Sequence, residues 1–381
     1  MKLLYVTHDI FKNTSANLRD LALIEGLLQN DVEVDLLYYQ GGLRLKVLTD
    51  KDDLTDFVSS KDKVGHAARG LFKNNSLKVF LAGVISKLFV YEKYSIMRFT
   101  SVRRILIKDV YDVIVSSSDP KYCHKLTCRI IRHFDLSAIF CQIWGDPFVS
   151  DISRRVSGIL KVAIGIEEKK LLASADKVFY LSKLTLTDQV RLYPSLSARM
   201  DYFYPPYLKE DVGNDLVEKL ELRLIYTGDY FSHIRRLEPL YKAVLGAGIK
   251  LSVIGSSDLY LESANGIEIL PRMAYEDLSV VVEKSNVNVV IGNLRGSQIP
   301  GKLFHCFGSS KPTLLICESS QYDFFKKEFG TISKLMIARN DVDSILASLN
   351  ELSVSLGTSG ILDDNYSPKK VASLILEKVY S

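Results

Sequence analysis

The sequence predicts an α/β protein made of two doubly wound parallel-sheet domains that face a cleft. Three observations lead to this fold class. The chain has 381 residues, which is enough for two domains. Short apolar strands alternate with helical segments in two successive series. A Tyr-Pro-Pro-Tyr segment at 204–207 separates the series, because two adjacent prolines continue neither a helix nor a central strand.

The first series opens with a β-α-β unit in residues 2–39. An apolar strand at 2–7 precedes a helix that Thr14 or Ser15 can cap, and alternating apolar residues from 32 to 36 predict the next strand. Further strands are expected at 113–116, 138–143 and 177–181, and helices at 122–133 and 156–173. Together these elements predict an N-terminal domain of residues 1–205.

The second series follows a charged stretch at 209–221. Strands are expected at 222–227, 251–254, 267–270, 287–291 and 313–317, with a short one near 335. Helices are expected from 235, from about 301, at 322–328, from 342 and at 368–379. We therefore predict a C-terminal domain of residues 206–365. A C-terminal helix within 366–381 follows it and can pack back on the N-terminal domain.

Composition and cysteine content narrow the class of protein. Hydrophobic residues make up 47% of the chain and charged residues 25%, as in ordinary globular proteins. The five cysteines form no CxxC pair and the histidines show no zinc spacing, so we expect no metal site and a reducing compartment. The first residues lack a signal-peptide layout, and the longest apolar stretch, 79–90, is too short to span a bilayer. We therefore expect a cytoplasmic protein.

A basic segment at 61–108 contains eleven Lys or Arg residues and two acidic ones, although the whole chain carries a net charge of only +4. Apolar residues are interspersed through it. This pattern predicts amphipathic helices that can make peripheral contact with the anionic inner face of the cytoplasmic membrane. Two ordinary helices with solvated basic faces are the equal alternative. No recognisable nucleic-acid module is present, so we expect no nucleic-acid partner.

The most informative motif is Gln-Ile-Pro-Gly-Lys-Leu-Phe-His at 298–305, which follows a predicted strand. Pro300 suits the first turn of a helix, and Gly301 allows close approach of a ligand to the backbone. Amide groups at the helix start, together with the ammonium of Lys302, predict a diphosphate site. An ordinary loop and helix with a solvated lysine is the alternative.

A second motif, Tyr-Thr-Gly-Asp-Tyr at 226–230, places Gly228 at the end of a strand, shortly before Arg235 and Arg236. Arginine presents a fixed fork of donors to phosphate oxygens, so one of the two arginines is expected to contact phosphate. The other is expected to be solvated.

These motifs resemble the donor-binding elements of bacterial family 4 (group 1) polysaccharide-building glycosyltransferases, which have the GT-B fold of two Rossmann-like domains. The turn at 270–278 resembles their nucleobase-binding turn, and the segments 111–120 and 141–148 resemble strand-and-loop segments of their N-terminal domain. The resemblance covers most of the chain. One position departs from the family, because His305 stands where a glutamate commonly holds the ribose hydroxyls.

The resemblance, together with the expected position of the loop at 8–15 at the cleft, gives each candidate residue a role. Candidates for catalysis are Asp146, Arg235 and Lys302. Candidates for donor binding are Gly228, Arg236, Arg272, Met273, Pro300, Gly301 and His305. Candidates for acceptor binding are His8, Asn13, Asn17 and Trp144. Two alternatives stay open: Asp146 can be a turn residue before a proline, and Trp144 can belong to the core.

The resemblance also implies an activity. The enzyme would move a hexosyl-like sugar from a UDP- or GDP-linked donor to a glycan or polyprenyl-linked acceptor during capsule or O-antigen synthesis. It would retain the anomeric configuration and need neither metal nor cofactor. Two alternatives have the same architecture: a sugar-nucleotide 2-epimerase, and a non-catalytic GT-B module in a polysaccharide assembly complex, with which His305 would agree.

Overall fold

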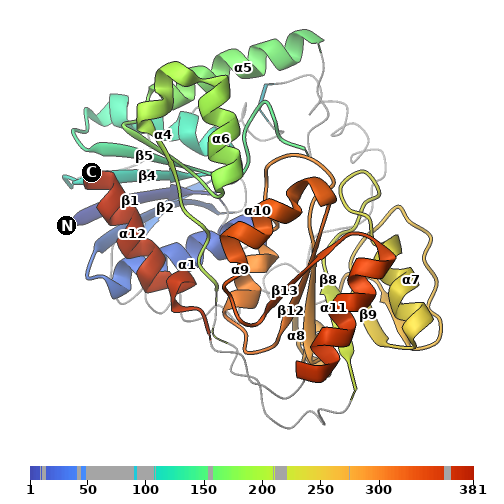
Figure 1. Cartoon of the computed structure of the whole chain (residues 1–381). Coiled ribbons are helices and arrows are strands. Elements are labelled where there is room, and N and C mark those ends of the chain that lie inside the picture. Colours follow the sequence, from blue (N-terminus) through green and yellow to red (C-terminus); the bar gives the residue numbers. More distant parts are fainter. Residues whose placement is uncertain are drawn as a thin grey trace. The chain divides into compact units, whose positions relative to one another are not determined.

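The chain divides into two compact units in the computed structural model (Figure 1). Unit 1 comprises Met1–Leu208 and Ser367–Ser381, and unit 2 comprises Lys209–Tyr366. The structure describes residues 1–8, 10, 14–40, 44–48, 90–91, 107, 109–152, 158–208, 210, 221–273, 275–355 and 362–381. Asn13 and nearly all of the basic segment at 61–108 lie outside these residues, so the predictions made for them stay predictions.

Unit 1 is built on a seven-stranded sheet with the order β3-β2-β1-β4-β5-β6-β7. Every neighbouring pair is parallel except β2 and β3. The strands are β1 (Lys2–Thr7), β2 (Glu33–Gln40), β3 (Arg44–Leu48), β4 (Val113–Ser117), β5 (Ile139–Trp144), β6 (Lys177–Tyr180) and β7 (Met200–Tyr202). The edge strands β3 and β7 were not predicted.

Helices cover both faces of this sheet, with α4, α5 and α6 on one side and α1 and α12 on the other (Figure 1). The helices are α1 (Ser15–Gln29), α4 (Tyr122–Phe134), α5 (Gly158–Ala173), α6 (Lys183–Leu192) and α12 (Pro368–Tyr380). A short 3-10 helix, Pro194–Arg199, follows α6. The sequence analysis did not predict α6, although the Ser182 hydroxyl caps it by accepting a hydrogen bond from the amide of Thr185.

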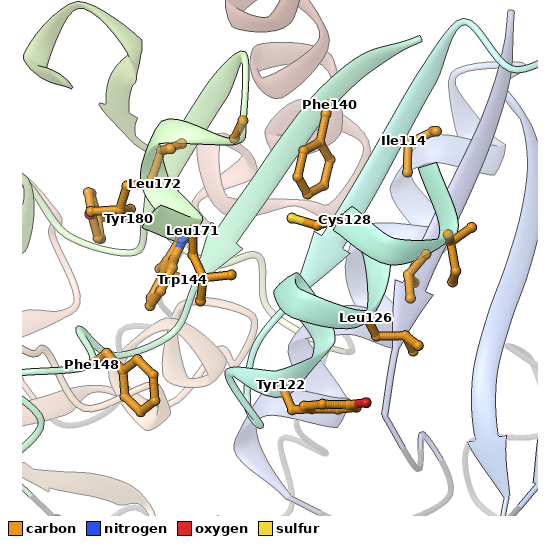
Figure 2. Close-up of a cluster of buried hydrophobic side chains, with 14 of the residues drawn as sticks. Ile114, Tyr122, Leu126, Cys128, Phe140, Trp144, Phe148, Leu171, Leu172 and Tyr180 are labelled. Atoms are coloured by element: carbon orange, nitrogen blue, oxygen red, sulfur yellow. The ribbon is translucent and has the colours of Figure 1, made fainter. Parts of the chain in front are cut away.

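Period-two alternation along the strands produces two separate cores. Leu4 and Ile114 belong to the cluster beneath α4 and α5, whereas Leu3 and Val113 belong to the cluster beneath α1 and α12. Figure 2 shows the first cluster, which combines aromatic side chains from β5 and α4 with leucines of α5. These strands are therefore buried on both faces, as expected of a parallel sheet between helical layers.

The C-terminal helix α12 packs on α1 within unit 1. Gly26 of α1 permits this close packing, because a Cβ atom there would lie 2.0 Å from the carbonyl oxygen of Pro368. The Asn30 side chain donates a hydrogen bond of 2.9 Å to the carbonyl of Lys369. The last segment of the chain thus completes the domain that the first segment begins.

Unit 2 is built on a six-stranded parallel sheet with the order β10-β9-β8-β11-β12-β13. Its strands are β8 (Arg223–Thr227), β9 (Lys250–Ile254), β10 (Ile267–Leu270), β11 (Val287–Ile291), β12 (Thr313–Cys317) and β13 (Leu335–Arg339). Its helices are α7 (Glu238–Ala247), α8 (Tyr275–Glu283), α9 (Lys302–Phe307), α10 (Ser319–Phe329) and α11 (Val342–Ser355), with a 3-10 turn at Asp364–Tyr366. The helix expected from 235 begins later, at Glu238, so Arg235 and Arg236 lie in the preceding loop.

Both sheets are doubly wound, and each has one point where the strand order reverses. In unit 1 this point lies between β1 and β4, and in unit 2 between β8 and β11. Open α/β sheets bind ligands beyond the carboxyl ends of the strands at such a switch point. Among the described residues, no helix combines the length and the hydropathy that a membrane span requires.

Candidate functional site

The loop after β8 lies at the switch point of unit 2. Gly228 adopts a φ of 135°, a backbone conformation that residues other than glycine rarely adopt. Its amide donates a 2.7 Å hydrogen bond to the carbonyl of Ile254, at the end of the neighbouring strand β9. The loop from Thr227 to Asp229 is therefore held in a fixed position at the carboxyl edge of the sheet.

Lys302, the first residue of α9, reaches this loop from the other side of the switch point. Its ammonium donates hydrogen bonds to the carbonyl oxygen and, at 2.9 Å, to the hydroxyl of Thr227. The residue as a whole is exposed, yet desolvation of the amino group, with a contribution from Arg235 and Arg272, lowers the pKa of Lys302 to about 8. The side chain is thus mostly protonated at neutral pH, and a bound anion would stabilise its charge.

Two arginines contact the same loop through Asp229. Arg235 donates from Nη1 to the Asp229 carbonyl at 2.8 Å, and Arg272 donates from Nη2 to the Asp229 carboxylate at 3.0 Å. The side chain of Arg272 is 73% exposed. The Nε group of Arg235 is buried and has no hydrogen-bond partner among the residues that the structure describes. Three cations and one carboxylate therefore surround one loop, an arrangement that favours an anionic ligand.

Arg236 is not part of this group. Its guanidinium forms an ion pair of 2.9 Å with Glu318 and donates at 3.4 Å to the carbonyl of Asn340. Glu318 and Asn340 follow β12 and β13, so the charge of Arg236 is balanced at those strands. Of the two adjacent arginines, the structure brings Arg235 and not Arg236 to the loop after β8.

The start of α9 has fewer free backbone amides than the sequence suggested. The amides of Leu303 and Phe304 donate to the carbonyls of Pro300 and Gly301, so they are already paired within the turn. Gly301 has an ordinary helical φ of −57°, and α9 has only six residues. The amides of Leu303 and Phe304 are therefore not among the free amides expected at the helix start, and the Lys302 side chain supplies positive charge to a ligand here.

His305 and Met273 complete the predicted donor residues. Burial, together with the nearby Lys302, lowers the pKa of His305 to about 4, so its imidazole is neutral at pH 7. Its Nδ1 atom is buried without a partner in the described part of the chain. A neutral imidazole can hydrogen-bond a diol, but it does not supply the charge of the glutamate usual in the resembling family. Met273 is half-buried after β10.

The corresponding edge of unit 1 carries mostly acidic groups. Asp146 follows β5, and burial together with the neighbouring carboxylate of Asp119 raises its pKa to about 7. The ammonium of Lys121 acts in the opposite direction. Lys121 is 4% exposed and bonds Asp119 at 2.6 Å and Asp151 at 3.0 Å. Asp146 is therefore a carboxyl group whose pKa is raised well above its usual range.

A buried ion pair lies at the switch point of unit 1. The Arg19 guanidinium donates to Asp20 at 2.8 Å, to the Ser117 hydroxyl at 2.7 Å and to the Ser118 carbonyl. The Asp20 carboxylate also accepts a 2.5 Å hydrogen bond from Thr7 at the end of β1. Arg19 and Asp20 thus join α1 to the ends of β1 and β4.

The predicted acceptor residues occupy different environments. Trp144 is fully buried, stacks on His124 with ring centroids 4.4 Å apart, and donates to Gln142 (Figure 2). Its indole is therefore part of the core, as the alternative reading of the sequence allowed, and Trp144 is corrected from an acceptor-binding candidate to a core residue. Asn17 is buried in the first turn of α1, where its amide donates to Thr14. His8 is half-buried directly after β1.

Comparison with known proteins identifies the fold. No protein-family model matches the chain, and no curated protein matches its sequence. Solved structures do match over its whole length. HepE of Anabaena, in complex with UDP and glucose, is 10% identical, covers 99% of this chain and 95% of its own, and has a TM-score of 0.52. An α-glucosyltransferase in complex with UDP is 9% identical, covers 100% of both chains, and has a TM-score of 0.53. The chain has the GT-B fold.

A third GT-B structure agrees with these two. The UDP-forming α,α-trehalose-phosphate synthase of Burkholderia vietnamiensis is 9% identical, covers 100% of this chain and 99% of its own, and has a TM-score of 0.52. At such identities the likeness defines the fold and leaves the activity to the residues. The predicted fold class is thereby confirmed, whereas assignment to glycosyltransferase family 4 stays a prediction.

Sequence reasoning missed Arg19, Asp20 and Lys121 in this GT-B chain. In the predicted helix, Arg19 and Asp20 fall between apolar positions and would be assigned to a solvated face. Lys121 follows Asp119-Pro120 in an unremarkable loop sequence. The sequence does contain one signal, because polar residues end two of the strands, at Thr7 and at Ser116–Ser118. They indicate a polar edge of the sheet, but not which charged side chains lie there. Among the described residues, no group of three or more His, Cys, Asp or Glu side chains could hold a metal ion.

Proposed function

We propose that the protein is a glycosyltransferase that binds the diphosphate of a nucleotide-sugar at the loop after β8. The observation that carries this proposal is the convergence of Lys302, Arg235 and Arg272 on residues 227–229 at the switch point of unit 2. In this GT-B chain, two of these cations lie in segments that resemble donor-binding elements and the third in the nucleobase turn. The assignment of Arg272 is revised from the base to the diphosphate, because its guanidinium pairs with Asp229.

The proposed reaction breaks the bond between the anomeric carbon and a phosphate oxygen. The nucleoside diphosphate leaves with the electron pair, and the acceptor oxygen forms the new bond to the anomeric carbon. Negative charge accumulates on the leaving group, and fixed cations that face it lower the barrier. Lys302, Arg235 and Arg272 supply this charge, so we propose a metal-independent transfer.

Asp146 of unit 1 is the proposed acceptor-orienting carboxylate. In its ionised form it accepts a hydrogen bond from the attacking hydroxyl, and its pKa of about 7 makes this form available at neutral pH. With retention of configuration, which the family resemblance implies, the hydroxyl proton passes to a phosphate oxygen of the donor. Asp146 then orients the nucleophile and does not need to hold the proton.

The finer assignment rests on the family resemblance. It supports transfer of a hexose-like sugar to a glycan or polyprenyl-linked acceptor in bacterial capsule or O-antigen synthesis. The basic segment at 61–108 supports peripheral contact with the inner face of the cytoplasmic membrane. Two of the similar solved structures are complexes with UDP, which makes UDP the first nucleotide to test.

The diphosphate site is tested by calorimetry with UDP and GDP and by a donor-hydrolysis screen across nucleotide sugars. We expect Lys302→Ala to weaken nucleotide binding by about 10- to 100-fold, as for loss of one charge-assisted hydrogen bond. The control is Lys327→Ala, which removes an equal charge from the exposed face of α10. Equal affinities of the two variants would reject the diphosphate site.

Product analysis separates the alternative activities. Conversion of the donor sugar to its 2-epimer without an acceptor would indicate an epimerase. Nucleotide binding with no turnover on any donor and acceptor would indicate a non-catalytic module, and the neutral His305 is the observation that favours this second candidate. Transfer of the sugar to a lipid-linked or free glycan would establish the transferase.

A further inference from the structure

Lys121 is a buried cation for which the proposed transfer gives no direct role. It precedes α4 and its side chain is almost completely removed from solvent. Burying an ammonium group is unfavourable unless its charge is compensated. Burial opposes the charge of Lys121, but Asp119, Asp151 and Asp146 outweigh it and raise its pKa. The lysine is therefore a permanent positive charge in the carboxyl edge of the unit 1 sheet.

The ion pair of Lys121 with Asp151 joins two segments that are distant in the sequence, and the pair with Asp119 lies within the loop after β4. Asp119, at 2.6 Å, belongs to the loop after β4, and Asp151, at 3.0 Å, belongs to the segment after β5. Asp146 lies on this second segment, between the end of β5 and Asp151. Glu168 of α5 holds the same segment from another side, by accepting hydrogen bonds from the amides of Phe148 and Val149. The segment that carries Asp146 is thus fixed by two buried charged side chains.

We propose that Lys121 is a positioning residue, which ties the loops after β4 and β5 together, holds the segment that carries Asp146 in place at the acceptor side, and puts a positive charge near the carboxyl group of Asp146. The proposal rests on the proposed function through the role of Asp146. Lys121 itself touches neither substrate nor donor in this scheme. Its effect passes through the two aspartates that it bonds and through its charge.

The charges that face Asp146 come from three elements. Asp119 and Asp151 disfavour its ionised form, whereas Lys121 and Arg19 of α1 favour that form. Removing Lys121 leaves three carboxylates with a single nearby cation, so the pKa of Asp146 must rise. Removing the charge of Asp151 must lower it. The two substitutions therefore shift the same group in opposite directions, which a general loss of structure would not do.

The test is a carbon-13 NMR titration of the Asp146 carboxyl, assigned by comparison with Asp146→Asn. We expect Lys121→Met to raise the pKa of Asp146 by about 1, Lys121→Arg to leave it nearly unchanged, and Asp151→Asn to lower it. The matched control is Lys125→Met, in the first turn of α4, which Lys121 precedes. It removes an equal charge and one ion pair, of 2.7 Å to Glu167, without touching the two loops. In active protein, we expect the acid limb of the pH dependence of kcat to shift in the same direction as the pKa of Asp146 in each variant.

The outcomes are distinct. Identical titrations of Asp146 in the Lys121→Met and Lys125→Met variants would overturn the proposal. If Lys121→Met does not fold, an unchanged titration in Asp151→Asn overturns it instead. The titration needs no turnover, so a failure of the proposed function appears separately as absence of nucleotide binding and transfer. Loss of kcat in both Lys121→Met and Lys121→Arg, without a shift of the pH profile, would reduce Lys121 to a purely structural residue.

Discussion

The two units share one architecture but differ in the sign, exposure and pairing of the charged side chains at the carboxyl edges of their sheets. In unit 2, the side chains around the loop after β8 are cationic and partly open to solvent, and Asp229 is the one carboxylate bonded within that group among the described residues. In unit 1, acidic groups predominate, and Arg19, Asp20, Lys121 and Asp151 are buried in ion pairs. The first edge is suited to an anion that arrives from solution. At the second edge, Arg19 and Lys121 are already paired with carboxylates before any ligand binds, and Asp146 is the carboxylate that the edge offers.

The largest effect that we expect is a loss of stability on breaking a buried ion pair of unit 1. Asp20→Ala leaves the Arg19 guanidinium buried without its partner, and we expect the free energy of unfolding of unit 1 to fall by about 3–5 kcal/mol. Urea denaturation followed by circular dichroism measures the change. The control is Glu221→Ala, which removes an exposed partner of Lys250 in unit 2 and should leave the unfolding midpoint almost unchanged. Similar losses in both variants would contradict the contrast between the two edges.

The second prediction concerns pH. Asp146 has a folded-state pKa of about 7, above its ordinary value of 3.8, so the folded state prefers the protonated form. The associated stability is present below about pH 4 and is lost as the pH rises to about 7, because the unfolded chain releases its proton first. Asp146→Asn should therefore be the more stable protein at pH 8, with the difference from wild type vanishing near pH 4. Urea denaturation of both proteins across this range measures it, and parallel stability curves from pH 4 to 8 would rule out a raised pKa.

The smallest effect that we expect is a difference in UDP affinity between variants of two adjacent arginines in unit 2. Arg235→Ala should weaken UDP binding about tenfold, because Arg235 lies at the loop after β8. Arg236→Ala should change the affinity little, because Glu318 already balances its charge. Calorimetry on both variants at one salt concentration measures the difference. The reverse ranking would move the diphosphate site toward the ends of β12 and β13.

The fold could be predicted from local patterns, whereas the buried charges could not. β4 and β11 are short, mainly apolar runs, and the expected strands at 113–116 and 287–291 agree with the observed ones within one residue. Lys302 was found because its neighbours, Pro300 and Gly301, form a local motif. Lys121 and Arg19 carry no such motif. Their burial depends on carboxylates from other elements, and helical periodicity assigns such residues to solvent.

The same limit explains the errors. The sequence places Arg235 and Arg236 side by side, and only tertiary contacts decide that one reaches Asp229 and the other Glu318. Trp144 lies in a loop-like motif by sequence, yet it is the last residue of β5, and its side chain points into the core cluster of Figure 2. Residue type and spacing therefore pointed to candidate loops, but did not show which side chain of each loop faces outward.

The packing of α12 on α1 has a consequence for how the protein is made. Unit 1 consists of two stretches of chain with all of unit 2 inserted between them. During translation the ribosome must therefore complete unit 2 before Val371, Ala372 and Ile375 of α12 can cover the apolar face of α1. Until then the first-made domain exposes that face, so the nascent chain passes through a stage at which chaperones can bind the earlier half while the later half is already folding.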